Sequence, residues 1–193
     1  MLEVVKDRIA QASGERPMSS RERLRRERLL EAARGYLWLR MPDHALQELN
    51  AVTDPAECAC DLYQLRAEAL REKKEYEAAI DAYTLALAED PDSVSVLLGI
   101  AWCYKRTDKL PRAIAVTQQA YHVRPDESIV LYNLSCYFSL AGDKTQALSW
   151  LGRALRMDKS LRELIANEKD FDQFRDDPDF QFVAGLRDVS GTP

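Results

Sequence analysis

Hydrophobic residues along most of the chain recur at the spacing of an α-helix. The clearest face follows positions i, i+3, i+4 and i+7 and is made of Leu97, Ile100, Ala101 and Tyr104. After the short polar segment 107–109, a second face follows, made of Ala113, Thr117 and Ala120. This pattern predicts pairs of helices joined by short turns.

The helical pattern repeats every 34 residues. A small residue followed by an aliphatic one recurs at Ala45-Leu46, Ala79-Ile80, Ala113-Ile114 and Ala147-Leu148. Small residues stand twelve positions before each pair, at Ala33, Ala67, Ala101 and Ser135, and Val52, Ala86, Ala120 and Ala154 stand seven positions after each alanine. Small residues at facing positions let two helices approach closely. Each unit leaves an apolar face that only a neighbouring unit can cover, so the units are expected to stack.

Prolines mark the expected ends of the second helices. Pro91 and Pro125 close the second and third units, because proline cannot continue the hydrogen-bond ladder of a helix. In the first unit Pro55 comes two residues early, which predicts a shortened second helix. At the start, Ser19 and Glu22 have the spacing of a capping box.

This pattern resembles the tetratricopeptide repeat family over about residues 26–159. The resemblance implies an all-α fold, a right-handed superhelical solenoid of helix–turn–helix repeats with a C-terminal capping helix. The expected organisation is a segment 1–18 that is disordered or a loose helix, four repeats within 19–159 (26–59, 60–93, 94–127 and 128–159), and a cap and tail over 160–193. Leu161, Leu164 and Ile165 are suited to covering the last repeat, and 171–180 is similar to the tail of some bacterial repeat groups.

The net charge of −5 argues against a nucleic-acid partner, which would call for a strongly basic domain. The charge is uneven, however. Residues 15–40 hold 8 Arg against 4 Glu, and residues 158–179 hold 8 acids against 4 bases. The basic stretch is interpreted mainly as intrahelical pairs on a solvated face. Self-association through the basic N-terminal and acidic C-terminal ends is the alternative.

No apolar run is long enough to insert into a membrane, and the N-terminus lacks the apolar core of a secretory signal, so a cytoplasmic protein is expected. Four cysteines, Cys58, Cys60, Cys103 and Cys136, suit a reducing compartment. No metal site is expected, because Cys58-x-Cys60 has no second ligand pair nearby.

The stretch 139–148, SLAGDKTQAL, contains a Gly-x-Lys-Thr run that could suggest a phosphate loop. The first glycine of such a loop is missing, Gly142 and Lys144 are not adjacent, and the preceding segment is helical. The repeat instead places Gly142 in the turn between two helices, with Asp143 as the cap of the next helix. No cofactor is expected, and no nucleophile–base spacing indicates catalysis.

In the tetratricopeptide family the first helix of each repeat lines a concave groove. The residues at these inward-facing sites are Arg34, Trp38, Gln64, Glu68, Arg71, Leu98, Trp102, Lys105, Tyr132 and Cys136. Aromatic and arginine side chains along one face suit an extended peptide or a partner helix. Trp38 and Trp102 could instead pack between repeats, whereas the groove is favoured for Tyr132.

Family members that hold acidic chaperone tails use Lys, Asn and Arg at particular groove sites. Here the two possible registers supply only Arg34 or Asn133, so that carboxylate clamp is not expected, and a peptide of mixed apolar and polar character is favoured. The predicted function is a non-catalytic scaffold or adaptor that binds a protein or peptide partner. The alternatives are a dedicated chaperone for a secreted or assembled protein, and a nucleotide-binding regulator or enzyme.

Overall fold

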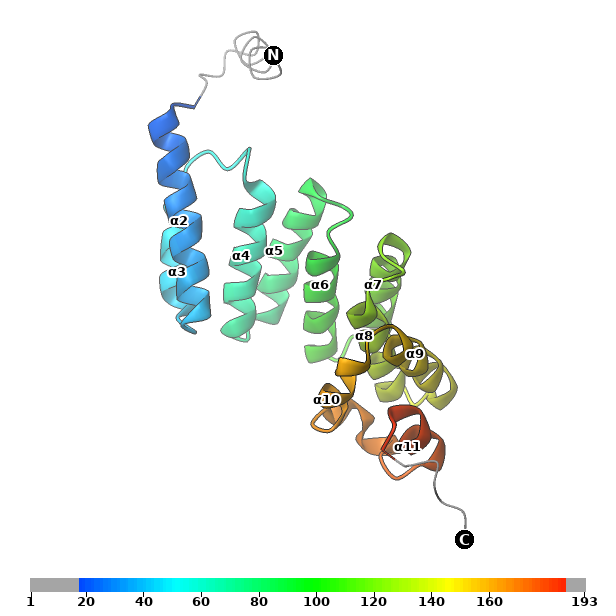
Figure 1. Cartoon of the computed structure of the whole chain (residues 1–193). Helices are drawn as coiled ribbons and strands as arrows, with labels where there is room; N and C mark the ends of the chain where they lie inside the picture. The colour runs from blue at the N-terminus through cyan, green and yellow to red at the C-terminus, as the bar shows by residue number, and fades with distance from the viewer. Residues whose placement is uncertain (1–17, 187–193) are drawn as a thin grey trace.

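The computed structural model describes residues 18–186, and the expectation for the N-terminal segment falls almost entirely outside them. The described residues form an all-α solenoid and contain no strand, as predicted. Figure 1 shows the helices side by side in pairs from α2 to α9, with short helical segments closing the C-terminal end. No helix within 18–186 is long and apolar enough to cross a membrane.

The four pairs occupy consecutive stretches of the chain. Their bounds are α2 Ser20–Trp38 with α3 Pro42–Asn50, α4 Ala59–Glu72 with α5 Tyr76–Glu89, α6 Val94–Arg106 with α7 Leu110–Val123, and α8 Ser128–Leu140 with α9 Lys144–Met157. The tail consists of η1 Lys159–Leu161, α10 Arg162–Ile165, η2 Lys169–Phe174 and α11 Pro178–Ala184. The helices α5 and α7 end two residues before Pro91 and Pro125, as the proline pattern predicted.

The small residues of the 34-residue pattern lie where helices meet. Ala33, Ala67 and Ala101 on the first helices are completely buried, and so are Ala45, Ala79 and Ala113 on the second helices. Because a methyl group needs little room, the paired backbones can pack closely while the larger side chains fill the space between pairs. The same positions in the fourth pair are held by buried Ser135 and Ala147.

Gly99 marks a close approach between the second and third pairs. A methyl group placed on Gly99 of α6 would lie 2.5 Å from Cζ of Tyr83 on α5. The Tyr83 side chain is itself almost completely buried, and this burial raises its pKa. The missing side chain at position 99 therefore makes room for the Tyr83 ring.

The turns within the four pairs share one backbone conformation. Arg40, Lys74, Asp108 and Gly142 are 34 residues apart and all have a positive φ, between 56° and 77°. Only glycine adopts this left-handed region without steric cost. Gly142 is therefore one of four equivalent turn residues, and the architectural interpretation of the Gly-x-Lys-Thr run is confirmed.

The first pair departs from the others in the predicted way. The Ser19 hydroxyl accepts a hydrogen bond from the Glu22 amide, and the Glu22 carboxylate accepts one from the Ser19 amide, which completes the capping box. Its second helix, α3, has 9 residues, whereas α5, α7 and α9 each have 14. The shortening follows the early Pro55.

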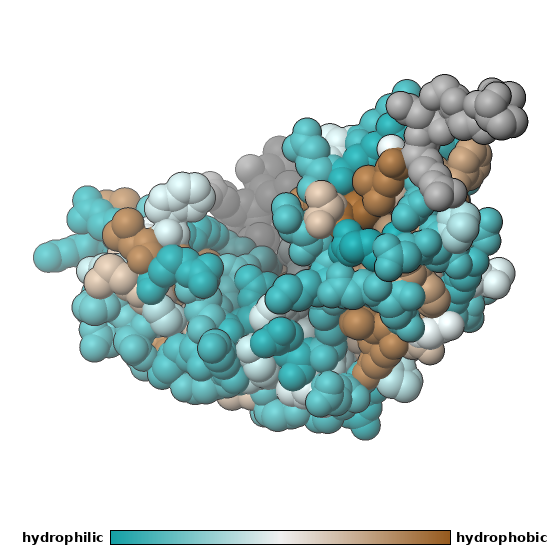
Figure 2. Space-filling view, turned by 90° about the horizontal axis from the view of Figure 1, so that it is seen from below, coloured by the Kyte–Doolittle hydropathy of each residue, from teal (hydrophilic) through white to brown (hydrophobic). Residues whose placement is uncertain are grey.

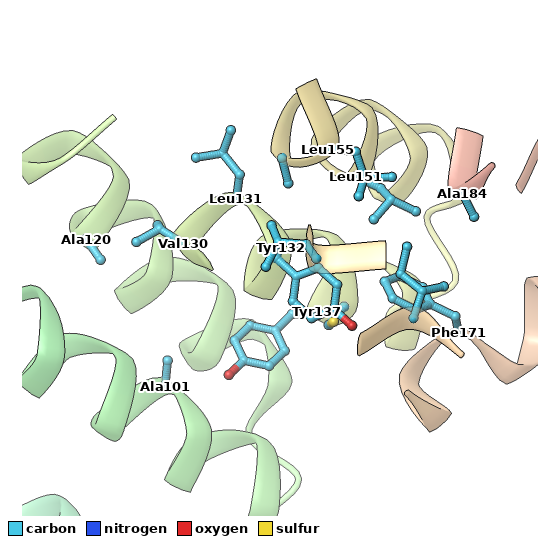
Figure 3. Close-up of a cluster of buried hydrophobic side chains, with 14 of the residues drawn as sticks. Ala101, Ala120, Val130, Leu131, Tyr132, Tyr137, Leu151, Leu155, Phe171 and Ala184 are labelled. Carbon is cyan, nitrogen blue, oxygen red and sulfur yellow. The ribbon is translucent and has the colours of Figure 1, made fainter. Parts of the chain in front are cut away.

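The C-terminal tail is not one capping helix but a chain of short segments folded back onto the last pair. In the segment 159–174, η2 packs against α8, and farther on α11 packs against α9. Phe171 and Phe180 are completely buried, with ring centroids 5.3 Å apart. Figure 3 shows Phe171 beside Tyr132 at the end of the core formed by α8 and α9. Leu161 and Ile165 are buried as expected, whereas Leu164 is exposed.

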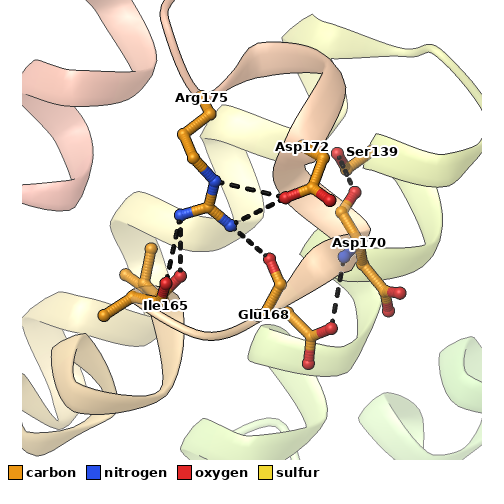
Figure 4. A network of polar contacts seen from close by, with 7 residues as sticks. Ser139, Ile165, Glu168, Asp170, Asp172 and Arg175 are labelled. Carbon is orange, nitrogen blue, oxygen red and sulfur yellow. Dashed lines mark hydrogen bonds and ion pairs between the residues drawn. The ribbon is translucent and has the colours of Figure 1, made fainter.

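Polar contacts hold η2 in place (Figure 4). The Ser139 hydroxyl of α8 donates to the backbone carbonyl of Asp170 at 2.7 Å. The Arg175 guanidinium donates to the carbonyls of Ile165 and Glu168 and to the Asp172 carboxylate. These bonds tie the loop between α10 and η2 to Arg175 and η2 to α8, so the tail has a defined path across α8.

Candidate functional site

The ten inward-facing residues predicted from the repeat are divided by the tail. Six of them are exposed or half-buried on α2, α4 and α6, the first helices of the first three pairs: Arg34, Trp38, Gln64, Glu68, Arg71 and Trp102. Leu98 is half-buried and packs against the core. The remaining three contact the tail or lie beneath it, namely Lys105, Tyr132 and Cys136.

Tyr132 and Cys136 lie in the interior rather than in an open groove. Tyr132 is 3% exposed and Cys136 is 2% exposed. The Phe171 ring of η2 meets the Tyr132 ring edge to face, with centroids 6.0 Å apart, and Lys105 of α6 pairs with the Asp170 carboxylate. Tyr132 therefore does not line an open groove as predicted, because the chain's own tail covers the inward face of α8.

The two tryptophans lie in different surroundings. Trp38, the last residue of α2, is 87% exposed, and Leu39 beside it is 63% exposed. Trp102 is half-buried against the core of the second and third pairs. Figure 2 looks onto the turn ends of the pairs and shows a mostly hydrophilic surface with small separate hydrophobic patches. Trp38 thus has its ring free, whereas Trp102 both packs and presents a face.

A first hollow of about 290 Å³ lies between α2 and α4. It is lined by Arg34, Leu37, Trp38, Leu65, Glu68, Arg71 and Glu72. The Arg34 guanidinium is held 2.8 Å from the Asp61 carboxylate. Leu37, Trp38 and Leu65 supply an apolar wall, and polar groups surround it, a composition typical of a site for an amphipathic segment.

A second hollow of about 440 Å³ lies between α4 and α6, near the turns. Its lining residues are Arg40, Arg71, Glu72, Lys74, Tyr76, Trp102 and Arg106. Arg71 and Glu72 line both hollows, so the two adjoin at α4. The open surface therefore extends over three successive first helices.

Two arginines stack on the Trp102 ring. The Arg71 guanidinium carbon lies 5.4 Å from the ring centroid and that of Arg106 lies 5.6 Å from it. Arg106 also lies 5.7 Å from the centroid of Tyr76, whose ring meets Trp102 edge to face. Such cation–π contacts orient a guanidinium while its N–H edge stays available.

Glu68 is fixed by a short polar chain along the same face. The Ser95 hydroxyl donates to the Gln64 side-chain oxygen at 3.4 Å, and the Gln64 amide donates to the Glu68 carboxylate at 3.0 Å. These bonds join α6 to α4 beside the first hollow. The side chains of Gln64 and Glu68 are thus held in place before any partner arrives.

In the Gly-x-Lys-Thr run, Asp143 caps a helix as predicted, whereas Lys144 makes contacts that the sequence pattern did not predict. The Lys144 ammonium lies 2.6 Å from the Asp177 carboxylate and 2.7 Å from that of Asp179, both near the start of α11. The Asp143 side chain accepts a bond from the Gln146 amide, so it caps α9. Lys144 therefore anchors the tail to the last pair.

A buried polar cluster beneath η2 brings Cys136 close to Glu168 and Asp170, with ligand atoms within 4.8 Å of one another. Burial and the nearby carboxylates raise the pKa of the Cys136 thiol well above its ordinary value. Lys105 neutralises Asp170. A protonated thiol and a carboxylate already paired with a lysine suit a structural contact better than a metal ion.

The charged ends of the chain find partners within it. The Arg26 guanidinium lies 2.7 Å from the Glu57 carboxylate, and Arg34 pairs with Asp61. In the acidic segment, Asp170 pairs with Lys105 and Asp177 with Lys144. The basic face of α2 is therefore linked to the second pair as well as to itself.

The sequence interpretation missed the lining residues Leu37, Arg40, Leu65, Glu72, Lys74, Tyr76 and Arg106. Repeat equivalence could have found three of them, Leu37, Glu72 and Arg106. Trp38, Glu72 and Arg106 occupy the same position in three successive units, and Leu37, Arg71 and Lys105 occupy the position before it. Extending the Trp38 position by one and two periods points directly to Glu72 and Arg106. The signal was present in the 34-residue period.

A family model for the tetratricopeptide repeat matches residues 70–135, which include the centre of this surface. Over residues 70–135 the chain belongs to the tetratricopeptide repeat family. Among curated proteins, no sequence match was found.

Solved structures share the tetratricopeptide repeat fold of this chain at low sequence identity. The structure of PilF from Pseudomonas aeruginosa aligns with a TM-score of 0.71 and 17% identity, covering 86% of this chain and 74% of that chain. A crystal structure of MamA aligns with a TM-score of 0.63 and 18% identity, covering 72% and 81%. YrrB, described as a tetratricopeptide repeat protein with an unusual peptide-binding site, aligns with a TM-score of 0.59 and 15% identity, covering 66% of each chain.

Proposed function

We propose that this protein is a non-catalytic scaffold that binds a segment of a partner protein on the surface formed by α2, α4 and α6. The observation that carries the proposal is the pair of adjoining hollows between these helices. They combine an exposed tryptophan, apolar side chains and arginines, the residue types that dominate the energetics of protein interfaces. The free cysteines, including the half-buried Cys58 and Cys60, support a role in a reducing compartment such as the cytoplasm.

The surface suits an extended peptide better than a folded domain. The hollows lie between successive first helices, and their walls combine apolar and charged side chains. The peptide-binding description of YrrB, a structural neighbour, is in keeping with such a role. Side chains held in place beforehand, such as Glu68, lower the entropy lost when a peptide binds.

A display selection tests the proposal. Random dodecapeptides are selected on the immobilised protein, and the affinity of the recovered peptides is measured for the wild type and for Trp38→Ala. Because Trp38 is 87% exposed, its truncation should leave the fold intact. Loss of an aromatic anchor costs about 2 kcal/mol, so binding should weaken about 30-fold.

The matched control is Phe182→Ala on α11, which removes another exposed aromatic ring, 65% exposed, from outside the surface. It should leave peptide affinity unchanged. Recovery of no peptide above background, or equal affinity for the wild type and Trp38→Ala, would refute the assignment of this surface.

A further inference from the structure

Trp102, Tyr76, Arg71 and Arg106 form a cluster, called here the Trp102 cluster. Its two guanidinium groups have no hydrogen-bond acceptor in the described part of the chain. Arg71 and Arg106 stack on aromatic rings, but neither side chain forms a hydrogen bond or an ion pair within residues 18–186. Other arginines on this side of the molecule are paired, Arg34 with Asp61 and Arg40 with Glu72. The two stacked arginines therefore keep their donors unused.

A second arginine–tryptophan cluster in the same protein shows the contrast. Arg153 lies 4.3 Å from the centroid of Trp150 and also stacks on Tyr121. Its guanidinium donates to the Tyr121 hydroxyl. There the stacking and the hydrogen bonding are both satisfied inside the protein, so stacking on tryptophan alone does not leave an arginine available.

The hollow beside Trp102 is strongly positive in an otherwise acidic protein. Its lining holds four cationic side chains, Arg40, Arg71, Lys74 and Arg106, against the single carboxylate of Glu72. The net charge of this lining is +3, whereas that of the whole chain is −5. A concentrated positive field of this kind attracts anionic partners and orients them on approach.

We infer that the Trp102 hollow recognises the carboxylates of an acidic peptide segment, and that Arg71 and Arg106 donate to them. A guanidinium presents two parallel N–H groups, which match the two oxygens of a carboxylate, and contact with an aromatic ring restricts its motion. An apolar side chain of the same segment would lie against Leu37 and Trp38 in the neighbouring hollow. The inference rests on the proposed function, because it specifies the ligand of the same surface.

Fluorescence anisotropy with two defined peptides tests the inference. One fluorescein-labelled nonapeptide alternates leucine with glutamate, and the other alternates leucine with glutamine. The glutamate peptide should bind the wild type at least about 10-fold more tightly than the glutamine peptide, and the preference should weaken as NaCl rises from about 0.05 M to about 0.5 M. Arg71→Gln/Arg106→Gln should abolish the preference, whereas Arg153→Gln, with a stacked arginine removed elsewhere, should retain it.

Equal binding of the two peptides, no binding of the glutamate peptide, or wild-type affinity in Arg71→Gln/Arg106→Gln would overturn the inference. The proposed function would still stand if display-selected peptides required Trp38. A second copy of the chain is the other possible occupant, and sedimentation velocity separates it. A dimer of the free protein that is lost in Arg71→Gln/Arg106→Gln would assign the hollow to self-association and overturn the inference.

Discussion

Replacing Gly99 by alanine sets helix propensity against packing, and the structure says which effect is larger. Alanine in a helix interior is favoured over glycine by about 1 kcal/mol. At position 99, however, the new methyl carbon would lie 2.5 Å from Cζ and 2.8 Å from the hydroxyl oxygen of Tyr83. The Tyr83 side chain is only 1% exposed and has no room to withdraw.

Overpacking of a buried site costs about 1–3 kcal/mol, and a contact this short corresponds to the upper end. Gly99→Ala should therefore lower the free energy of unfolding by about 2 kcal/mol after the gain in propensity. For a protein of this size that corresponds to a fall in Tm of about 6 °C. Thermal unfolding followed by far-ultraviolet circular dichroism measures the shift.

Gly35→Ala is the matched control, because Gly35 also lies within a helix and a methyl group there would meet nothing within 4 Å. It should raise Tm by about 2–3 °C, since only the propensity gain applies. In a Tyr83→Leu background, the penalty of Gly99→Ala should disappear. A Gly99→Ala variant as stable as the wild type would refute the steric argument.

Two further predictions concern the tail. Iodoacetamide should label half-buried Cys60 faster than buried Cys136, and Phe171→Ala should accelerate labelling of Cys136 by uncovering it, as measured by mass spectrometry. The Asp177 pKa is lowered by its bond with Lys144, so this carboxylate stabilises the fold above its unfolded pKa and loses that effect as pH falls through its folded pKa. Lys144→Met should therefore lose less stability than the wild type between pH 7 and about pH 3 in urea unfolding.

For each of these two predictions, one result would contradict the proposed role of the tail contact. In the labelling experiment Cys103, buried elsewhere with a pKa raised to about 11, should stay slow in Phe171→Ala. Acceleration at both cysteines would indicate general loosening instead of removal of the tail. If Lys144→Met and the wild type lose the same unfolding free energy on acidification, the ion pair between Lys144 and Asp177 does not contribute to the pH dependence of stability.

The 34-residue period was sufficient to predict the helix pairs because each unit solves the same packing problem. Ala67 and Ala79 face one another for the same reason as Ala101 and Ala113, and all four are completely buried. The period also identified Gly142 as a turn residue, which its φ of 77° confirms. Local chemistry predicted the first pair too, since a capping box and an early proline act within a few residues of their position.

The path of the tail could not be predicted in this way. Lys105 and Asp170 meet across 65 residues, and the acidic segment offers several other carboxylates that Lys105 could have chosen. The repeat treats Lys105 as equivalent to Arg71, and nothing in its position shows that one is paired and the other free. Burial of Tyr132 likewise depends on Phe171, whose segment lies outside the period.

Because the tail occupies the inward face of the fourth pair, the open surface also limits the length of partner that it can contact. Successive helices pack about 10 Å apart, so the two steps from α2 to α6 span about 20 Å. An extended chain advances about 3.3 Å per residue, so the open surface has room for about six residues of an extended peptide. A fourth open helix would lengthen it to about nine. If the proposed function holds, the number of partner residues in contact with the open surface is set by η2, and not by the number of repeats.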